Sequence, residues 1–243
     1  MPEKRYHRNV GCTVFPTFTD GVEKMLIAGI LGSESKLQTA SIISSMLTLK
    51  GDKVSIIDPA GMPGIDGKRI RAYISELEKN NIDILILKLN IADAYSYLPD
   101  DIRFDILIYT DKSSNSTSDD KTEYSVILGK VFSMLAEKGV AIVNVDDSEL
   151  IQLLKGKKHR FITYGFNTKA SVTTSSVGDA VFKDGFICCL QRSVSTRTGR
   201  VIEPQEYKIG LYTGESEFDS HNLLAAASFA IINDIDLNQL SLQ

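Results

Sequence analysis

The stretch LIAGILGSESKLQTASIISSML, residues 26–47, decides the fold. It begins as an apolar run, passes through a loop with two glycines, Gly29 and Gly32, and continues as an amphipathic helix. The first N–H groups of a helix have no partner within it and can bind an anion. The stretch therefore predicts a strand, a phosphate-type loop and a helix.

The rest of the first two thirds of the chain alternates apolar runs with helical patterns. The runs predict six strands, at residues 25–30, 53–58, 82–90, 104–110, 139–145 and 160–165. Apolar residues at helical spacing lie between them: Leu37, Ala40, Ile43, Met46 and Leu47; Ile70, Tyr73, Ile74 and Leu77; Val126, Leu128, Val131, Phe132 and Leu135. Such alternation predicts an α/β fold with a mostly parallel six-stranded sheet, helices on both faces and a P-loop-like start. Residues 111–124, rich in Ser and Asp, predict an exposed loop.

After Gly165 the apolar pattern changes to period two, which predicts antiparallel strands. Turns are expected at residues 183–185 and 196–200, and a helix follows near the C-terminus, with a further turn or helix after it. We therefore divide the chain into an N-terminal extension (1–24), a parallel core (25–166), a small antiparallel β-layer (167–213) and a C-terminal helical segment (214–243).

Composition excludes several classes of protein. The net charge is −4, and acidic and basic residues alternate along the chain, so we expect no nucleic-acid partner. The three cysteines have neither a disulfide framework nor a metal-ligand spacing. No signal peptide and no run of 18 apolar residues is present, so we expect a cytoplasmic protein without a membrane span.

Two later segments carry a family resemblance. The first segment is VFSMLAEKGVAIVNVDDSEL followed by RFITYG. It is similar to a pattern of a helix ending in Leu-Phe, a strand, the sequence Asn-x-Asp-Asp and a second strand ending in Tyr-Gly. GESEFDSHNLLAAASFAI resembles a Gly, Phe-Asn, then Asn plus Ala-rich helix pattern, with Asp219 for the first Asn and Asn222 for the second. In this order, from Met25 onwards, they resemble the central ATP-binding domain of the Mur ligases.

The resemblance implies ATP-dependent amide formation through an acyl phosphate, with Mg²⁺ as a second cofactor. Family ligases also carry an acceptor domain and an amino-acid domain. The chain has room for neither, so we expect a stand-alone central domain, and a ligase built on it would need a partner chain to supply them. The oligomeric state is left open.

The phosphate loop departs from the family motif Gly-Thr-Asn-Gly-Lys-Thr. Aligning the glycines at 29 and 32 puts Ser33 at the lysine and Glu34 at the Mg²⁺-binding hydroxyl. An anion there repels phosphate. Lys36 is the candidate that could reach in from the helix, but a helical residue at that position points sideways, so we favour a solvated lysine on the first turns. The resemblance implies a nucleotide site of Gly29, Gly32, Ser33, Glu34, Ser35, Lys36 and Asn222.

Two other family positions are also changed. Lys88 stands where the family has a Mg²⁺-binding glutamate, and a cation cannot ligate Mg²⁺. We expect Lys88 to pair with Glu34 or with a bound anion. In the family's Thr-Asn-x-x-x-Asp-His segment, Thr110 remains, Asp111 replaces Asn and no histidine is present. These changes argue against strong ATP hydrolysis and against Mg²⁺ binding. The free N–H groups at the start of the helix can still hold an anion, so weak binding of phosphate or nucleotide stays open, with ATP and Mg²⁺ as the cofactors to test, and no metal ligand is assigned.

Two further groups have a functional and a structural interpretation. His221 lies next to Asn222, near the family's adenine position, and we favour helix capping or packing for it. Lys68, Arg69 and Arg71 could face a phosphorylated or carboxylated ligand, but we favour a charged first turn of a surface helix.

The leading hypothesis is a non-catalytic binding or assembly module, a pseudoenzyme of cell-wall peptidoglycan or related amide-ligase metabolism. The alternative is an ATP-dependent carboxylate–amine ligase, or one subunit of it, with Lys36 and Lys88 as catalytic residues in altered positions. A third hypothesis, a partition-type ATPase, requires a carboxylate where Lys88 stands.

Overall fold

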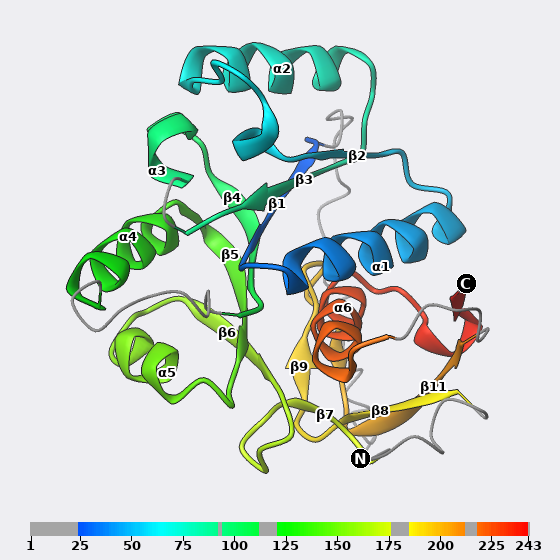
Figure 1. Cartoon of the computed structure of the whole chain (residues 1–243). Helices are drawn as coiled ribbons and strands as arrows, with labels where there is room; N and C mark the ends of the chain where they lie inside the picture. The colour runs from blue at the N-terminus through cyan, green and yellow to red at the C-terminus, as the bar shows by residue number, and fades with distance from the viewer. Residues whose placement is uncertain (1–23, 92–93, 112–120, 176–184, 212–217, 243) are drawn as a thin grey trace, which may run out of the picture.

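All six predicted parallel strands form, and they lie in one sheet (Figure 1). The computed structural model describes residues 24–91, 94–111, 121–175, 185–211 and 218–242. The strands are β1 Leu26–Leu31, β2 Val54–Ile57, β3 Ile84–Leu89, β4 Phe104–Tyr109, β5 Leu135–Asn144, β6 Arg160–Tyr164, β7 Val172–Thr174, β8 Phe186–Leu190, β9 Val194–Ser195, β10 Val201–Ile202, β11 Gln205–Leu211 and β12 Ser241–Leu242. The helices are α1 Ser35–Lys50, η1 Pro59–Gly61, α2 Gly67–Lys79, α3 Ala94–Tyr97, α4 Lys121–Ser133, α5 Ser148–Leu154, α6 Ser220–Ile232 and η4 Leu237–Gln239.

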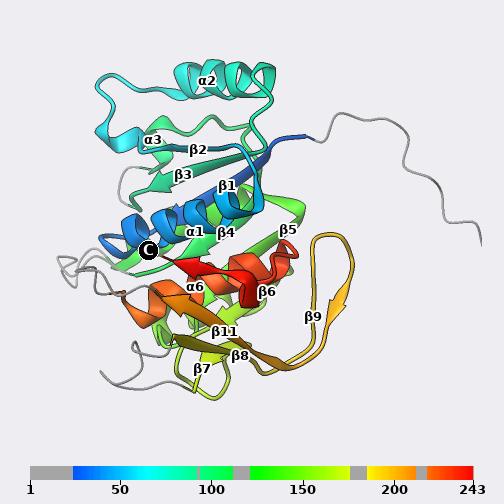
Figure 2. The same cartoon turned by 90° about the vertical axis from the view of Figure 1, so that its right-hand side faces the viewer.

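The sheet order is β12-β11-β8-β7-β6-β5-β4-β1-β3-β2. Strands β1 to β6 pair in parallel, as predicted, and β6 also pairs in parallel with β7. Strand β8 pairs antiparallel with β7 on one side and with β11 on the other, but these strands extend the main sheet and do not form a separate layer. A small antiparallel sheet does form from β9 and β10, around the predicted turn at residues 196–200 (Figure 2).

Helices cover both faces of the sheet, as predicted (Figure 1). One face packs under α1 and α6, around Ile43, Met46 and Phe229, which are buried. The other packs under α2, α4 and α5, around Ile70 and Phe132. Apolar strand residues alternate between the two cores, because successive side chains in a strand point to opposite faces.

Three residues of the predicted helix faces lie elsewhere. Leu37 is 50% exposed and Val126 is 51% exposed, so neither belongs to the buried stripe of its helix. Leu135 begins β5, because α4 ends at Ser133. The predicted loop at residues 111–124 ends earlier than expected, because α4 begins at Lys121. Residues 112–120 of that loop and residues 183–184 of one predicted turn lie outside the described residues. The closing helix and the turn after it form as predicted, as α6 and η4.

Candidate functional site

The predicted phosphate loop lies at the carboxyl end of β1, between the ends of β3 and β4. After β1 the chain crosses to β2, returns to β3 beside β1, and then continues at β4 on the other side of β1. Open α/β sheets bind ligands at such a switch point, outside the carboxyl ends of the strands. The loop and the ends of its two neighbouring strands therefore form the candidate site.

The loop consists of Gly32, Ser33 and Glu34, because β1 ends at Leu31 and α1 begins at Ser35. Gly29, which we predicted to be a loop glycine, lies inside β1 and pairs with residues of β3 and β4. A Cβ atom at Gly29 would lie 2.7 Å from Leu107 Cδ2. The glycine is therefore explained by close packing of the central strands, and the alignment that started the loop there is wrong.

Lys36, on the first turn of α1, folds back over the loop. Its side chain is buried, and its Nζ donates to Gly32 O at 3.0 Å, to Ser33 O at 2.9 Å and to Asn90 Oδ1. This position over the loop is the alternative that we did not favour, since we expected a solvated lysine on the first turns of the helix. It arises because a first-turn residue with a long side chain leans back towards the N-terminus of its helix.

Asp111 lies on the other side of the loop, directly after β4. Its Oδ1 accepts the Ser33 N–H at 3.1 Å and the Thr110 hydroxyl at 2.7 Å. The Thr110 hydroxyl also lies 3.0 Å from Leu31 O. The end of β4 is thereby joined to the end of β1.

Lys88 lies near the end of β3 and pairs with Asp58, with 3.4 Å between Lys88 Nζ and Asp58 Oδ2. Glu34, one of the partners we predicted for it, is exposed at the start of α1. The pairing with Asp58 follows from the sheet order, since β2 lies beside β3.

Asn222 joins the first turn of α6 to α1. Its Nδ2 donates to Gln38 Oε1 at 2.7 Å, and its Oδ1 accepts the Thr39 hydroxyl at 3.2 Å. Asp219 caps the same turn by accepting the His221 and Asn222 N–H groups. The Asn222 side chain, which we predicted to bind a nucleotide, thus forms hydrogen bonds within the protein, and these bonds hold α1 and α6 together.

His221 forms a small surface cluster with residues at the ends of β5 and β6. Its Nε2 lies 3.2 Å from Asp146 Oδ2, and its ring lies 4.3 Å from that of Phe166 with a tilt of 59°. Asp146 also accepts the Phe166 and Asn167 N–H groups. Phe166 is 50% exposed. This aromatic cluster was missed in the sequence, where its residues are far apart.

A buried tyrosine network supports the same edge of the sheet. Tyr109 donates to Asp147 Oδ2 at 2.8 Å, Tyr124 lies 2.7 Å from the Tyr109 hydroxyl, and Tyr164 donates to Tyr109 O at 2.9 Å. Burial raises the pKa of Tyr109 and Tyr164 and raises the pKa of Tyr124 to about 12. The hydroxyls therefore stay protonated at neutral pH.

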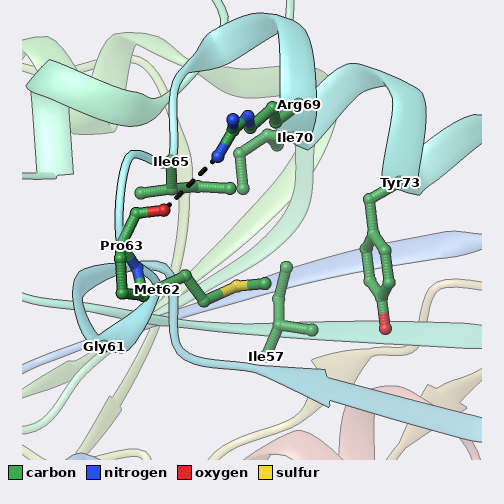
Figure 3. Close-up of a pocket in the computed structure, with 8 residues that line it drawn as sticks. All are labelled: Ile57, Gly61, Met62, Pro63, Ile65, Arg69, Ile70 and Tyr73. Atoms are coloured by element: carbon green, nitrogen blue, oxygen red, sulfur yellow. Dashed lines mark hydrogen bonds between the residues drawn. The ribbon is translucent and has the colours of Figure 1, made fainter.

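A cavity of about 320 Å³ opens between the end of β2, η1 and the start of α2 (Figure 3). Most of its lining is apolar, and it consists of Ile57, Gly61, Met62, Pro63, Ile65, Arg69, Ile70 and Tyr73. Arg69 Nη1 donates to Pro63 O at 3.3 Å, while Arg71 pairs with Asp101 at 2.6 Å. Of the predicted basic group, Arg69 therefore lines the cavity, whereas Arg71 is held by an acidic partner.

Within the described ranges, no cluster of three or more His, Cys, Asp or Glu side chains could hold a metal ion. Among the helices of those same ranges, none is long and apolar enough to span a membrane.

The fold and the loop define a P-loop-like α/β protein. The chain belongs to the Mur ligase middle domain family, which matches residues 32–230. A comparison of the sequence with curated proteins gives no match.

Solved structures share the fold at low identity. A UDP-N-acetylmuramoyl-L-alanyl-D-glutamate–2,6-diaminopimelate ligase is 15% identical with a TM-score of 0.62, over 88% of this chain and 44% of its own. A UDP-N-acetylmuramate:L-alanyl-γ-D-glutamyl-meso-diaminopimelate ligase from Neisseria meningitides is 11% identical with a TM-score of 0.57, over 90% and 67%.

A bifunctional folylpolyglutamate synthase/dihydrofolate synthase from Yersinia pestis, complexed with AMPPNP and Mn, is 11% identical with a TM-score of 0.53. The match covers 54% of the length of that protein and 90% of this chain. The chain thus spans about half the length of the first and third of these proteins.

Proposed function

We propose that the chain is a nucleotide-binding module of Mur ligase type that does not itself hydrolyse ATP. The observation that carries this proposal is the position of Lys36, whose ammonium group lies at the loop carbonyls. With Gly29 inside β1, the family motif Gly-Thr-Asn-Gly-Lys-Thr aligns with Gly32-Ser33-Glu34-Ser35-Lys36-Leu37. In this register Lys36 takes the place of the phosphate-binding lysine, and Ser33 no longer does.

The same alignment of the motif shows that the usual Mg²⁺ ligands of the family are replaced in this chain. Leu37 takes the place of the hydroxyl that would hold the metal, and Lys88 takes the place of the glutamate. Lys88 is paired with Asp58, so it compensates a carboxylate of the protein. The residues present therefore suit the phosphates of a nucleotide but not its metal ion.

The aromatic cluster at residues 166 and 221 supplies a surface for a base. A half-exposed ring at the same edge of the sheet can stack on a nucleobase, and such stacking contributes about 1–3 kcal/mol. The His221 ring packs against the Phe166 ring, and its Nε2 also contacts Asp146.

Replacing Phe166 with alanine is expected to weaken ADP binding about tenfold, because the stacking surface is lost. Isothermal titration calorimetry measures this. Inorganic pyrophosphate, which has no base, should bind both proteins equally, and the matched variant Phe166→Tyr should retain ADP binding. Equal ADP affinity in all three proteins would place the base elsewhere.

Replacing Lys88 with glutamate is expected to lower the free energy of unfolding by about 1 kcal/mol, because the new carboxylate repels Asp58 at this partly exposed position. Millimolar Mg²⁺ should restore part of the loss, since two adjacent carboxylates can ligate it. Chemical denaturation with and without Mg²⁺ measures both effects. Lys157→Glu, the same change at an exposed loop residue, should show no response to Mg²⁺.

The rival proposal is that the chain takes part in ATP-dependent amide formation, as a ligase or as one subunit of a ligase. The supporting observation is that a ligase and a synthase complexed with AMPPNP and Mn share its fold over 88% and 90% of this chain. The decisive assay is ATP turnover with Mg²⁺. We expect ADP and ATP to bind without hydrolysis, whereas turnover that is lost in Lys36→Met and Lys88→Met would favour the ligase.

A further inference from the structure

The phosphate loop already holds an anion that belongs to the protein. Asp111 Oδ1 lies 3.1 Å from the Ser33 backbone nitrogen, which is a donor of the loop itself. The contact is close-packed, because a Cβ atom at Gly32 would lie 2.5 Å from the same carboxylate oxygen. The side chain is partly buried, with Thr110 as a second donor.

A carboxylate and a phosphate compete for the same kind of donor. Backbone N–H groups at a glycine loop bind phosphate through its oxygen atoms and its negative charge, and a carboxylate presents both. A phosphate that enters the loop must therefore displace Asp111 from the Ser33 N–H or accept a second negative charge a few Å away. Both the displacement of Asp111 and the repulsion between the two negative charges make the free energy of phosphate binding less favourable.

Lys36 completes this arrangement on the carbonyl side. Its Nζ donates to Gly32 O and Ser33 O, while Asp111 accepts from Ser33 N. In the loop at Gly32 and Ser33, the backbone carbonyls are thus bonded to the positive Lys36, and a backbone N–H is bonded to the negative Asp111. The loop has a defined hydrogen-bonded geometry that requires no bound ligand.

We propose that Asp111 is an internal competitor that lowers the affinity of the loop for phosphate groups. The inference rests on the proposed nucleotide-binding function of the same loop. Asp111 determines how much ligand is needed to open the loop, while Lys36 supplies the charge that the entering phosphate meets. Nucleotide binding is accordingly weak in the wild-type chain, because it requires displacement of the Asp111 carboxylate from the Ser33 N–H.

The test is the substitution Asp111→Asn, which retains one oxygen acceptor for Ser33 N–H and Thr110, removes the charge and replaces the other oxygen by an amide NH₂. Calorimetric titration with pyrophosphate and with ADP is expected to show about tenfold tighter binding of both, the size expected when a partly exposed charge near the ligand is removed. Asp100→Asn makes the same change at an exposed residue and should bind as the wild type does.

A second variant keeps the proposal testable if the asparagine distorts the loop. Asp111→Ala removes the acceptor, so its melting temperature without ligand should fall, and pyrophosphate should raise it more than it raises that of the wild type. This follows because the added anion takes the vacated position.

The outcomes separate the two proposals. Equal affinities of the wild type and Asp111→Asn for pyrophosphate, with measurable binding in both, would overturn the competitor role and leave the nucleotide-binding function standing. Absence of binding by the wild type and by both variants at millimolar pyrophosphate and ADP would overturn both proposals.

Discussion

Replacing Lys36 with methionine is expected to lower the affinity for ADP about 100-fold. A lysine that meets a phosphate in a partly buried loop contributes about 3 kcal/mol through charge-assisted hydrogen bonds, and 1.4 kcal/mol corresponds to a factor of ten. Methionine keeps the apolar length of the side chain, which is buried against the loop. Isothermal titration calorimetry with ADP measures the change.

The same substitution also removes three donors from the loop of the free protein. Gly32 O, Ser33 O and Asn90 Oδ1 lose their ammonium partner, so the free energy of unfolding should fall by about 1–2 kcal/mol. Denaturant titration measures this separately from binding, and ADP titrations are then done at a temperature where both proteins are folded.

Lys50→Met is the matched control for Lys36→Met, since Lys50 lies at the other end of the same helix and pairs with Asp52 at 3.2 Å. It should bind ADP as the wild type does. If Lys36→Met also retained wild-type affinity, Lys36 would be a structural cap of the loop and the nucleotide-binding proposal would lose the observation that carries it.

The fold could be predicted from the sequence because apolar periodicity is a local signal. The runs that became β1, β3 and β4 are almost entirely apolar and buried, as strands covered on both faces require. The pairing of strands is a non-local property. For this reason the antiparallel strands β7, β8 and β11 were recognised, whereas their continuation of the main sheet was not.

The candidate site was predicted less well, for a related reason. Gly29 and Gly32 have the spacing of the two motif glycines, and the sequence alone offers no way to see that the first is packed between β3 and β4. Lys88 could be recognised as a changed residue, but its partner Asp58 follows from the order of strands. The contact between His221 and Asp146 joins residues 75 positions apart.

The two glycines provide a direct test of the loop register. Gly32→Ala is expected to weaken ADP binding about 100-fold, comparable to the loss of Lys36, because its Cβ atom would lie 1.9 Å from Thr110 Oγ1. Thr110 is buried and bonded to Leu31 O, so it cannot move aside without cost. The loop must shift instead, and the free energy of unfolding should also fall by about 1–3 kcal/mol.

Gly29→Ala is the matched control, because its Cβ atom also meets a close contact, at 2.7 Å from Leu107 Cδ2, but inside the sheet. It should destabilise the protein by a similar 1–3 kcal/mol, roughly the cost of overpacking, and leave the ADP affinity of the folded protein unchanged. Denaturant titration and calorimetry on both variants give the two quantities. If Gly29→Ala reduced ADP binding as strongly as Gly32→Ala, then residue 29 would act as part of the loop, and the register that places Lys36 at the phosphate would have to be given up.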